Sequence, residues 1–276
     1  VRLLSASLML IFSLSMGMTA HATRENGTEN GTENAAEAQT PEEELTPEEQ
    51  AQKALEEAYA IPVESNGIKN WPQGPGTYGD AAIVMEAGTG AILYAKNIDA
   101  QEYPASITKV MTALLAAKYG NMDEEVTISA RAVDLGEDSQ LCGLKEGDRV
   151  TLDELYRGMV IFSGNDAAMA IAEQVGGSEE QFVEMMNEEA RRLGATNTHF
   201  VNPHGLQDEN HYTTVYDIYL ILREAMKYDS FMDVAKEGYC TLHVTHKDGT
   251  REALYLSSTD KYMVGQAEPP KGVTVI

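Results

Sequence analysis

The chain of 276 residues carries a formal net charge of −24, and its basic residues do not cluster, so nucleic acid is not an expected partner. The acidity favours solubility and says little about a substrate. Two cysteines, Cys142 and Cys240, lie far apart in the sequence, and either one disulfide or two unpaired buried thiols would fit them.

Residues 1–22 have the pattern of a signal peptide. Arg2 supplies the positive start, residues 3–18 are mostly apolar, and Ala20-His21-Ala22 fits the small-x-small cleavage rule. The apolar run is short for a membrane span and has no stop-transfer flank, although an uncleaved N-terminal anchor stays the alternative. We therefore expect an exported protein with an extracytoplasmic location at the cell envelope.

Residues 23–60 predict an acidic low-complexity tether followed by a short helix. Eleven glutamates against Arg24 and Lys53 give this stretch a net charge of −9, and Asn-Gly-Thr-Glu repeats within residues 25–34. Such a segment cannot bury enough apolar surface to offset the entropy of ordering it. Residues 47–60 then begin with a proline and early glutamates, as helices do. Whether this helix docks on the rest of the chain is left open by the sequence.

From residue 81 onward the sequence predicts strands, then a block of helices, then strands again. Residues 81–86 and 91–95 predict a β-hairpin around a glycine-rich turn, and a second strand pair is expected around Asp248-Gly249, at residues 239–244 and 252–256. Between them, residues 124–131 predict a short strand and turn, and helices are expected after Ser106 and at residues 152–161, 167–175, 178–193 and 212–227. This order fits an α+β domain whose antiparallel sheet is closed by both ends of the chain and flanked by a cluster of helices.

Ser106 and Lys109 form a Ser-x-x-Lys pair at the start of an apolar run, residues 110–117. The run contains no Gly or Pro and predicts a buried helix. A spacing of three residues puts the two side chains next to each other on one helical face. A serine hydroxyl needs an adjacent base, and a lysine can be that base if burial lowers its pKa. The pair therefore predicts a nucleophile and its base, although the same spacing is common in helices that carry no chemistry.

A second candidate cluster, Ser163-Gly164-Asn165, falls between two predicted apolar helices. A turn held by two buried helices can project a hydroxyl and an amide into a cleft. Ser163 could relay a proton to or from a leaving nitrogen, and Asn165 could hydrogen-bond Lys109 or a substrate amide. An ordinary polar turn between helices is the alternative interpretation.

Taken together, these motifs resemble those of the penicillin-recognising serine enzymes, in the same order. The similarity is closer to one family, the D-alanyl-D-alanine carboxypeptidases among the low-molecular-mass penicillin-binding proteins. The stretches that carry it are residues 103–112, 143–149, 162–168, 202–206 and 211–214 with Asp217. The resemblance runs from about residue 81 to the end of the chain. It implies a β-lactamase/transpeptidase-like fold, with a D-Ala-D-Ala carboxypeptidase catalytic domain at residues 61–276.

The resemblance also implies a role for each motif residue. Ser106 would be the nucleophile that forms the acyl-enzyme, Lys109 its general base, Ser163 the proton shuttle, and Asn165 an assisting residue that binds the substrate amide. The backbone N–H of Ser106 would contribute to the oxyanion hole. The implied substrate is the D-Ala-D-Ala end of a peptidoglycan stem peptide, and β-lactam antibiotics are the implied inhibitors. No metal or organic cofactor is implied, and a peripheral association with the membrane stays open.

One motif of the family has no counterpart in the chain. The family carries Lys-Thr-Gly, or a close variant, on a strand that lines the cleft. In the nearest candidate, Lys247-Asp248-Gly249, an acid replaces the hydroxyl residue and the tripeptide falls in a predicted hairpin turn. Residues 272–276 resemble the strand that precedes this motif in the family. We therefore expect the catalytic domain to be C-terminally incomplete, with the C-terminal part of the sheet missing from the chain.

Three other functions compete with the carboxypeptidase. A β-lactamase or a transpeptidase would share the fold, but class A β-lactamases carry Ser-Asp-Asn where this chain has Gly164 in the middle. A non-catalytic peptidoglycan-binding relative stays open because the third motif is missing, although the four intact motif residues argue against it. A metal site is not favoured, because the spacings of the histidines match no standard ligand pattern; these are His199, His204, His211, His243 and His246.

Overall fold

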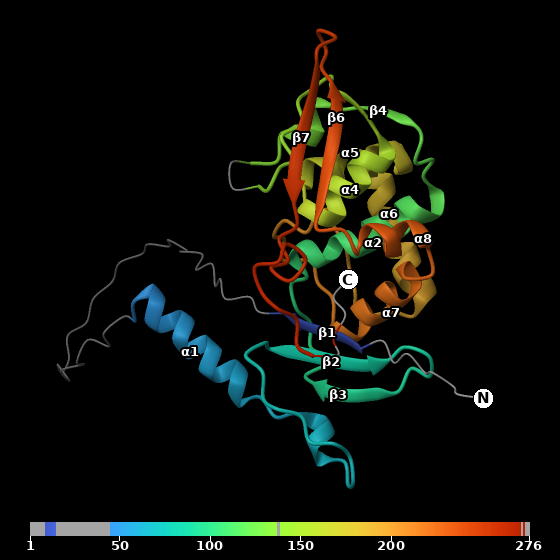
Figure 1. Ribbon diagram of the computed structural model, residues 1–276. Coiled ribbons are helices and arrows are strands. Elements are labelled where there is room, and N and C mark those ends of the chain that lie inside the picture. Colours follow the sequence, from blue (N-terminus) through green and yellow to red (C-terminus); the bar gives the residue numbers. More distant parts are fainter. Residues whose placement is uncertain (1–8, 15–44, 137–138, 272, 274–276) are drawn as a thin grey trace, which may run out of the picture.

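The computed structural model describes residues 9–14, 45–136, 139–271 and 273. Two antiparallel sheets lie at opposite ends of a cluster of helices (Figure 1). The expected α+β class, with antiparallel strands flanked by helices, is confirmed. The two sheets are separate, so the expectation of a single sheet closed by both ends of the chain is wrong.

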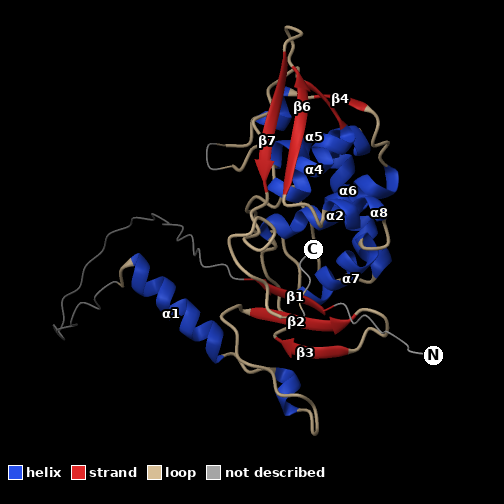
Figure 2. Ribbon diagram, in the orientation of Figure 1, coloured by secondary structure: helices blue, strands red, loops and turns tan. Residues whose placement is uncertain are grey.

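The first sheet has the strand order β1-β2-β3, and its strands are β1 (Met9–Leu14), β2 (Ala81–Glu86) and β3 (Ile92–Lys96). The predicted hairpin is confirmed as β2 and β3, which pair antiparallel with an irregularity after Val84. β1 pairs antiparallel with the other edge of β2, from Met9 opposite Glu86 to Leu14 opposite Ala81. Helix α7 (Val215–Ala225) packs against β2, so the first sheet supports the helical cluster from below in Figure 2.

The second sheet has the order β4-β5-β6-β7, and its strands are β4 (Glu125–Thr127), β5 (Arg149–Thr151), β6 (Tyr239–Thr245) and β7 (Arg251–Ser257). The predicted strand pair around Asp248-Gly249 is confirmed as β6 and β7. These strands do not reach the first sheet, because the β6 edge pairs with β5 and the apolar face of the hairpin packs on helix α4 (Leu152–Phe162). Leu242 and Val244 supply that face and are fully buried.

The helices confirm most of the sequence expectations. Beside α4 and α7 they are α1 (Pro47–Ala60), α2 (Lys109–Tyr119), α3 (Ala130–Val133), α5 (Asn165–Gly176), α6 (Glu179–Leu193) and α8 (Asp229–Val234). The predicted cap of α4 is a full capping box between Thr151 and Glu154. Helix α7 begins three residues later than predicted because Thr214 is its N-cap. Helices α2 and α5 are largely buried in the core, and the turns that carry the candidate site residues lie directly in front of them.

The predicted helix at residues 47–60 is confirmed as α1, and its C-terminal end is tied to the first sheet. The fully buried Lys96 donates from Nζ to the carbonyls of Ala58 (2.6 Å), Thr77 (2.7 Å) and Gly79 (2.7 Å). The Tyr59 ring also packs against Tyr78, with 4.9 Å between centroids. The helix therefore docks at its end, while most of its length is exposed.

The expected signal peptide and tether lie almost entirely outside the described residues, which include only residues 9–14 and 45–46 of them. Within the part of the chain that the structure describes, none of the helices has the length and apolar character that crossing a membrane requires.

Candidate active site

Ser106 lies on a short 3₁₀ turn, Ala105–Thr108, directly before α2. The chain enters this turn with a left-handed Ala105 (φ 45°), a strained conformation for a residue with a side chain and one that recurs at functional sites. The Ser106 side chain is exposed, whereas Lys109 is only 5% exposed because it begins a helix that is buried on nearly every face. The turn therefore presents the hydroxyl to solvent and its neighbouring amine to the protein interior.

The predicted contact between Ser106 and Lys109 is present. Lys109 Nζ lies 3.1 Å from Ser106 Oγ and donates a second hydrogen bond of 2.8 Å to the His204 carbonyl. Burial lowers the pKa of Lys109 to about 8, although the negative charge of Asp166 opposes the shift. The lowered pKa leaves more of the Lys109 amine neutral near pH 7 than a solvated lysine would have, which is what a base needs.

The second cluster lies on the turn between α4 and α5. Ser163 ends α4 in a left-handed conformation (φ 67°), and Asn165 is the first residue of α5. Asn165 Nδ2 donates to Ser139 Oγ (2.7 Å), and its buried Oδ1 has no hydrogen-bond partner among the described residues. A buried amide oxygen without a partner is costly, so this atom is a natural acceptor for an N–H group brought by a ligand.

The two clusters lie at the N-terminal ends of α2 and α5, and no hydrogen bond joins them among the described residues. Helices α2 and α5 pack together, and Lys109 lies near enough to Asp166 for the negative charge of this carboxylate to affect the pKa of the lysine. Within the described ranges, no hydrogen bond joins Ser163 or Asn165 to Ser106 or Lys109. The expected alternative in which Asn165 bonds Lys109 is therefore not adopted: Lys109 Nζ donates to Ser106 and His204, and Asn165 Oδ1, the atom that could accept from a lysine, has no partner among the described residues.

Asp166 is a site-supporting residue that sequence reasoning missed. Its side chain is fully buried and accepts hydrogen bonds from the backbone N–H groups of Cys142 (2.8 Å), Gly143 (3.1 Å) and Leu144 (3.2 Å). It therefore clamps residues 142–144 against the turn that carries Ser163 and Asn165. The available signal was an acidic residue in the first turn of an otherwise apolar helix.

The remaining candidates lie elsewhere or are already occupied. Lys247 sits in the β6–β7 turn with its aliphatic chain against Gly147, at the tip that projects away from α2 in Figure 1. Cys142 and Cys240 are both buried and unpaired, so no disulfide joins them. In the described part of the chain no group of three or more His, Cys, Asp or Glu residues could hold a metal ion.

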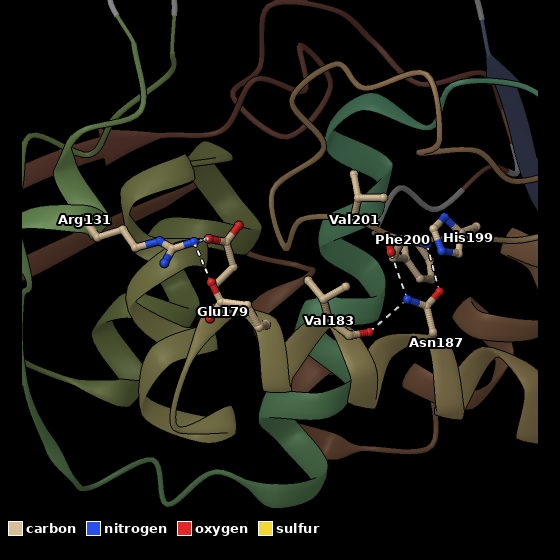
Figure 3. Close-up of a pocket in the computed structure, with 8 residues that line it drawn as sticks. Arg131, Glu179, Val183, Asn187, His199, Phe200 and Val201 are labelled. Atoms are coloured by element: carbon tan, nitrogen blue, oxygen red, sulfur yellow. Dashed lines mark hydrogen bonds and ion pairs between the residues drawn. The ribbon is translucent and has the colours of Figure 1, made fainter.

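A cavity of about 340 Å³ lies away from Ser106, between α3, α6 and the segment 199–201 (Figure 3). Its polar groups are already paired. Arg131 forms ion pairs with Glu179 and Glu180, and Asn187 Nδ2 donates to the Val183 and Phe200 carbonyls. None of the four predicted site residues lines this cavity, so it is not the candidate active site.

Comparison with known proteins places the chain in a family. The profile of the peptidase S11 family, described as D-alanyl-D-alanine carboxypeptidase, matches residues 69–259. The chain is 40% identical over 186 residues to the D-alanyl-D-alanine carboxypeptidase DacF of Bacillus subtilis (strain 168), covering 66% of this chain and 44% of that protein. It is 38% identical over 163 residues to DacD of Escherichia coli (strain K12), covering 55% of this chain and 42% of that protein. The chain thus spans less than half the length of these curated relatives.

Solved structures agree with the sequence comparison. The Streptomyces K15 DD-transpeptidase superposes with a TM-score of 0.63 at 31% identity, over 67% of this chain and 75% of that chain. Penicillin-binding protein 6B from Escherichia coli superposes with a TM-score of 0.62 at 31% identity, over 71% of this chain and 62% of that chain. The expected β-lactamase/transpeptidase-like fold is confirmed. With its Ser-x-x-Lys turn and Ser-Gly-Asn turn on that fold, the chain belongs to the D-alanyl-D-alanine carboxypeptidase family.

Proposed function

We propose that the protein is a serine-type D-alanyl-D-alanine carboxypeptidase that removes the terminal D-Ala from peptidoglycan stem peptides and is acylated by β-lactams. The observation that carries the proposal is the Ser106–Lys109 pair. An exposed hydroxyl lies 3.1 Å from a buried amine whose pKa burial lowers to about 8, in a chain that matches this family over residues 69–259. This is the arrangement that activates a serine nucleophile.

In the proposed reaction, neutral Lys109 takes the proton from Ser106 as Oγ attacks the carbonyl carbon of the penultimate D-Ala. The negative charge that develops on the carbonyl oxygen is stabilised by backbone N–H groups, including that of Ser106. The C–N bond breaks when the leaving D-Ala nitrogen receives a proton, which we assign to Ser163 as the shuttle. Asn165 Oδ1 accepts a hydrogen bond from the substrate amide. Attack by water on the acyl-enzyme then regenerates Ser106.

The setting of the reaction is part of the proposal. We place residues 1–22 as a signal peptide, residues 23–60 as an acidic tether with a short helix, and residues 61–276 in the catalytic domain. The Arg2, apolar-run and Ala20-His21-Ala22 pattern supports export to the cell envelope. The acidic surface, with a net charge of −24, supports the absence of a nucleic-acid partner. A peripheral membrane association fits the envelope location.

A transpeptidase is the second candidate, because one of the similar solved structures is a DD-transpeptidase. Both reactions pass through the same acyl-enzyme on Ser106 and differ in whether water or an amine accepts the acyl group. Measuring hydrolysis and transfer of one stem-peptide substrate in the presence of an added amine acceptor separates the two.

The test of the proposal is covalent labelling of the full-length protein with a fluorescent penicillin. Ser106→Ala should abolish labelling, and intact mass should show one adduct on the wild type. The matched controls Ser257→Ala and Ser258→Ala, at the end of β7, should label as the wild type does. Labelling that survives Ser106→Ala would refute the assignment of the nucleophile.

A further inference from the structure

The segment 201–206 is fastened to the nucleophile turn at several points. Thr112 Oγ1 donates to the Pro203 carbonyl (2.6 Å), and Lys109 Nζ donates to the His204 carbonyl (2.8 Å). Gly205 (φ 90°) lies so close that a Cβ there would be 1.8 Å from the Ala105 carbonyl oxygen. The segment therefore forms one wall behind the Ser106–Lys109 pair, and its placement decides where the His204 carbonyl meets the lysine.

The buried His211 connects the segment 201–206 to the nucleophile turn, residues 105–108. Its Nδ1 accepts a hydrogen bond from the Val201 backbone N–H (3.2 Å), and its Nε2 lies 2.8 Å from Thr108 Oγ1. Since Nδ1 accepts, the ring proton sits on Nε2 and is donated to Thr108. His211 is 2% exposed and packs edge-on against Phe200, with 5.6 Å between centroids. Both ring nitrogens therefore form hydrogen bonds: Nδ1 with the segment 201–206 and Nε2 with the nucleophile turn. These two hydrogen bonds together form the junction between the segment and the turn.

We propose that His211 is a positioning residue for acylation: it holds Thr108 of the nucleophile turn and the Val201 amide at once, and so fixes the His204 carbonyl against Lys109. The inference rests on the proposed function, because it concerns the Ser106–Lys109 pair. It adds a residue that touches neither the substrate nor the reacting atoms.

The protonation state of His211 fits this role. Burial lowers its pKa to about 4, so the ring is neutral through the neutral pH range. The titratable groups that face it are Asp208, His199 and His204. His204 is itself kept neutral, since burial lowers its pKa to about 3. A protonated His211 would turn its Nδ1 into a donor facing the Val201 N–H, and the junction would lose a hydrogen bond.

Replacing His211 should change the pKa of Lys109 and the rate at which Ser106 is acylated. A looser segment lets water reach the lysine, and water favours its charged form, so the pKa of Lys109 should rise. The wider spread of Ser106–Lys109 geometries should lower the acylation rate at least about tenfold, with little change in the noncovalent affinity for penicillin.

The experiment measures the rate constant of Ser106 acylation by a fluorescent penicillin between pH 6 and 10 in the full-length protein. His211→Leu removes both hydrogen bonds, and His211→Gln places an amide donor where Nε2 lies, whereas His211→Asn reaches only the position of Nδ1. We expect His211→Leu to lower the rate and to move the rising limb of the pH profile to higher pH. His211→Gln should recover most of the rate, and His211→Asn should recover less.

A second pair of variants separates positioning from stability. Thr108→Val should lower the rate in the same way, and combining it with His211→Leu should add little, because each variant alone already removes the Thr108–His211 hydrogen bond. Val126→Ala, in the buried middle of β4, is the matched destabilised control and should lower the melting temperature without moving the pH limb.

Two outcomes overturn the inference. One is a His211→Leu protein with the rate and pH profile of the wild type. The other is a set of His211 variants whose rates follow only their melting temperatures, as that of Val126→Ala would. If His211→Leu does not fold, equal rates for the Gln and Asn variants overturn it instead. The proposed function fails separately, by labelling that survives Ser106→Ala.

Discussion

Gly164, the middle residue of the Ser-Gly-Asn turn, has no room for a side chain. A Cβ at this position would lie 2.2 Å from Cys142 Sγ and 3.0 Å from Asp166 Oδ1. An aspartate in the middle of the turn, as in class A β-lactamases, would therefore displace Cys142 and the loop that Asp166 clamps. The packing at this residue disfavours the β-lactamase alternative more directly than the sequence difference alone does.

Gly164→Ala should consequently destabilise the protein by about 1–3 kcal/mol, measured by urea unfolding, because the added methyl group overpacks the site. Cys142→Ala removes the clashing sulfur, so the double variant should regain much of the lost stability. Gly67→Ala is the control, since nothing lies within 4 Å of a Cβ there, and its stability should not fall. Equal losses for Gly164→Ala with and without Cys142→Ala would contradict this packing argument.

Lys109 gives a prediction about pH. Burial lowers its pKa to about 8, and only the neutral amine can accept the Ser106 proton. The acylation rate should therefore rise with pH below about 8 and level off above it. The unfolded lysine binds its proton up to a higher pH, so this group makes folding stability increase with pH between the two values. Stopped-flow acylation from pH 6 to 10 tests the rate, and a rate that does not rise with pH anywhere in this range would exclude Lys109 as the base.

The residues of the candidate site differ in how far the sequence could identify them. The contact between Ser106 and Lys109 follows from helical spacing alone, whereas Ser163 and Asn165 needed the family resemblance. The contact of Thr108 with His211 spans 103 positions, and that of Asp166 with Cys142 spans 24. Local periodicity carries no information about such partners, so these supporting residues became visible only in the folded chain.

Among the elements, α1 depends on a single buried side chain for its attachment. Lys96 satisfies three backbone carbonyls, one of them in the last turn of the helix. Lys96→Met should leave these acceptors without a donor and cost about 1–3 kcal/mol of unfolding free energy. Trypsin should also cleave faster after the exposed Lys69, because the connection behind α1 loosens.

The control for that experiment is Lys53→Met on the exposed face of α1. Among the described residues Lys53 makes a single long surface ion pair, with Glu57 (3.8 Å), which contributes little. Its stability and proteolysis should match the wild type. If Lys96→Met behaves like Lys53→Met, the attachment of α1 comes from the Tyr59–Tyr78 contact instead.

Element positions were predicted better than element partners. The hairpins, the capped starts of α4 and α6, and the order of the helices follow from turn residues and apolar periodicity. These signals do not reveal to which sheet β6 and β7 belong, because that depends on the pairing of Arg149 in β5 with Thr245 in β6. Helix α8, with six residues, is too short to produce a periodic signal.

For the whole molecule, the lack of a Lys-Thr-Gly motif within residues 1–276 predicts that these residues by themselves release D-Ala slowly. The family uses a cationic, hydroxyl-bearing strand to hold the terminal carboxylate of the substrate, and Lys247 lies on a distant hairpin turn against Gly147. A lost charge-assisted hydrogen bond of about 1.5–3 kcal/mol corresponds to a rate about ten- to a hundredfold lower. The measurement compares D-Ala release by residues 1–276 and by the same residues with a strand carrying Lys-Thr-Gly fused after Ile276. Rates that agree within about threefold would mean that a residue within 1–276 binds the substrate carboxylate.

The expected export of the protein can be tested at its N-terminus. The signal-peptide pattern predicts cleavage after Ala22, so N-terminal sequencing of the secreted protein should begin at Thr23. A retained N-terminus would instead support the uncleaved anchor.

Cleavage at that position also has a consequence for β2, which pairs with β1 along its full length in the structure. β1 lies within residues 1–22, so a protein cleaved after Ala22 would lack this strand of the first sheet. Removing β1 leaves a row of backbone N–H and C=O groups on β2 without partners, and such an edge readily accepts another strand. Another strand could pair with this edge of β2 only after cleavage, because β1 occupies the edge until then.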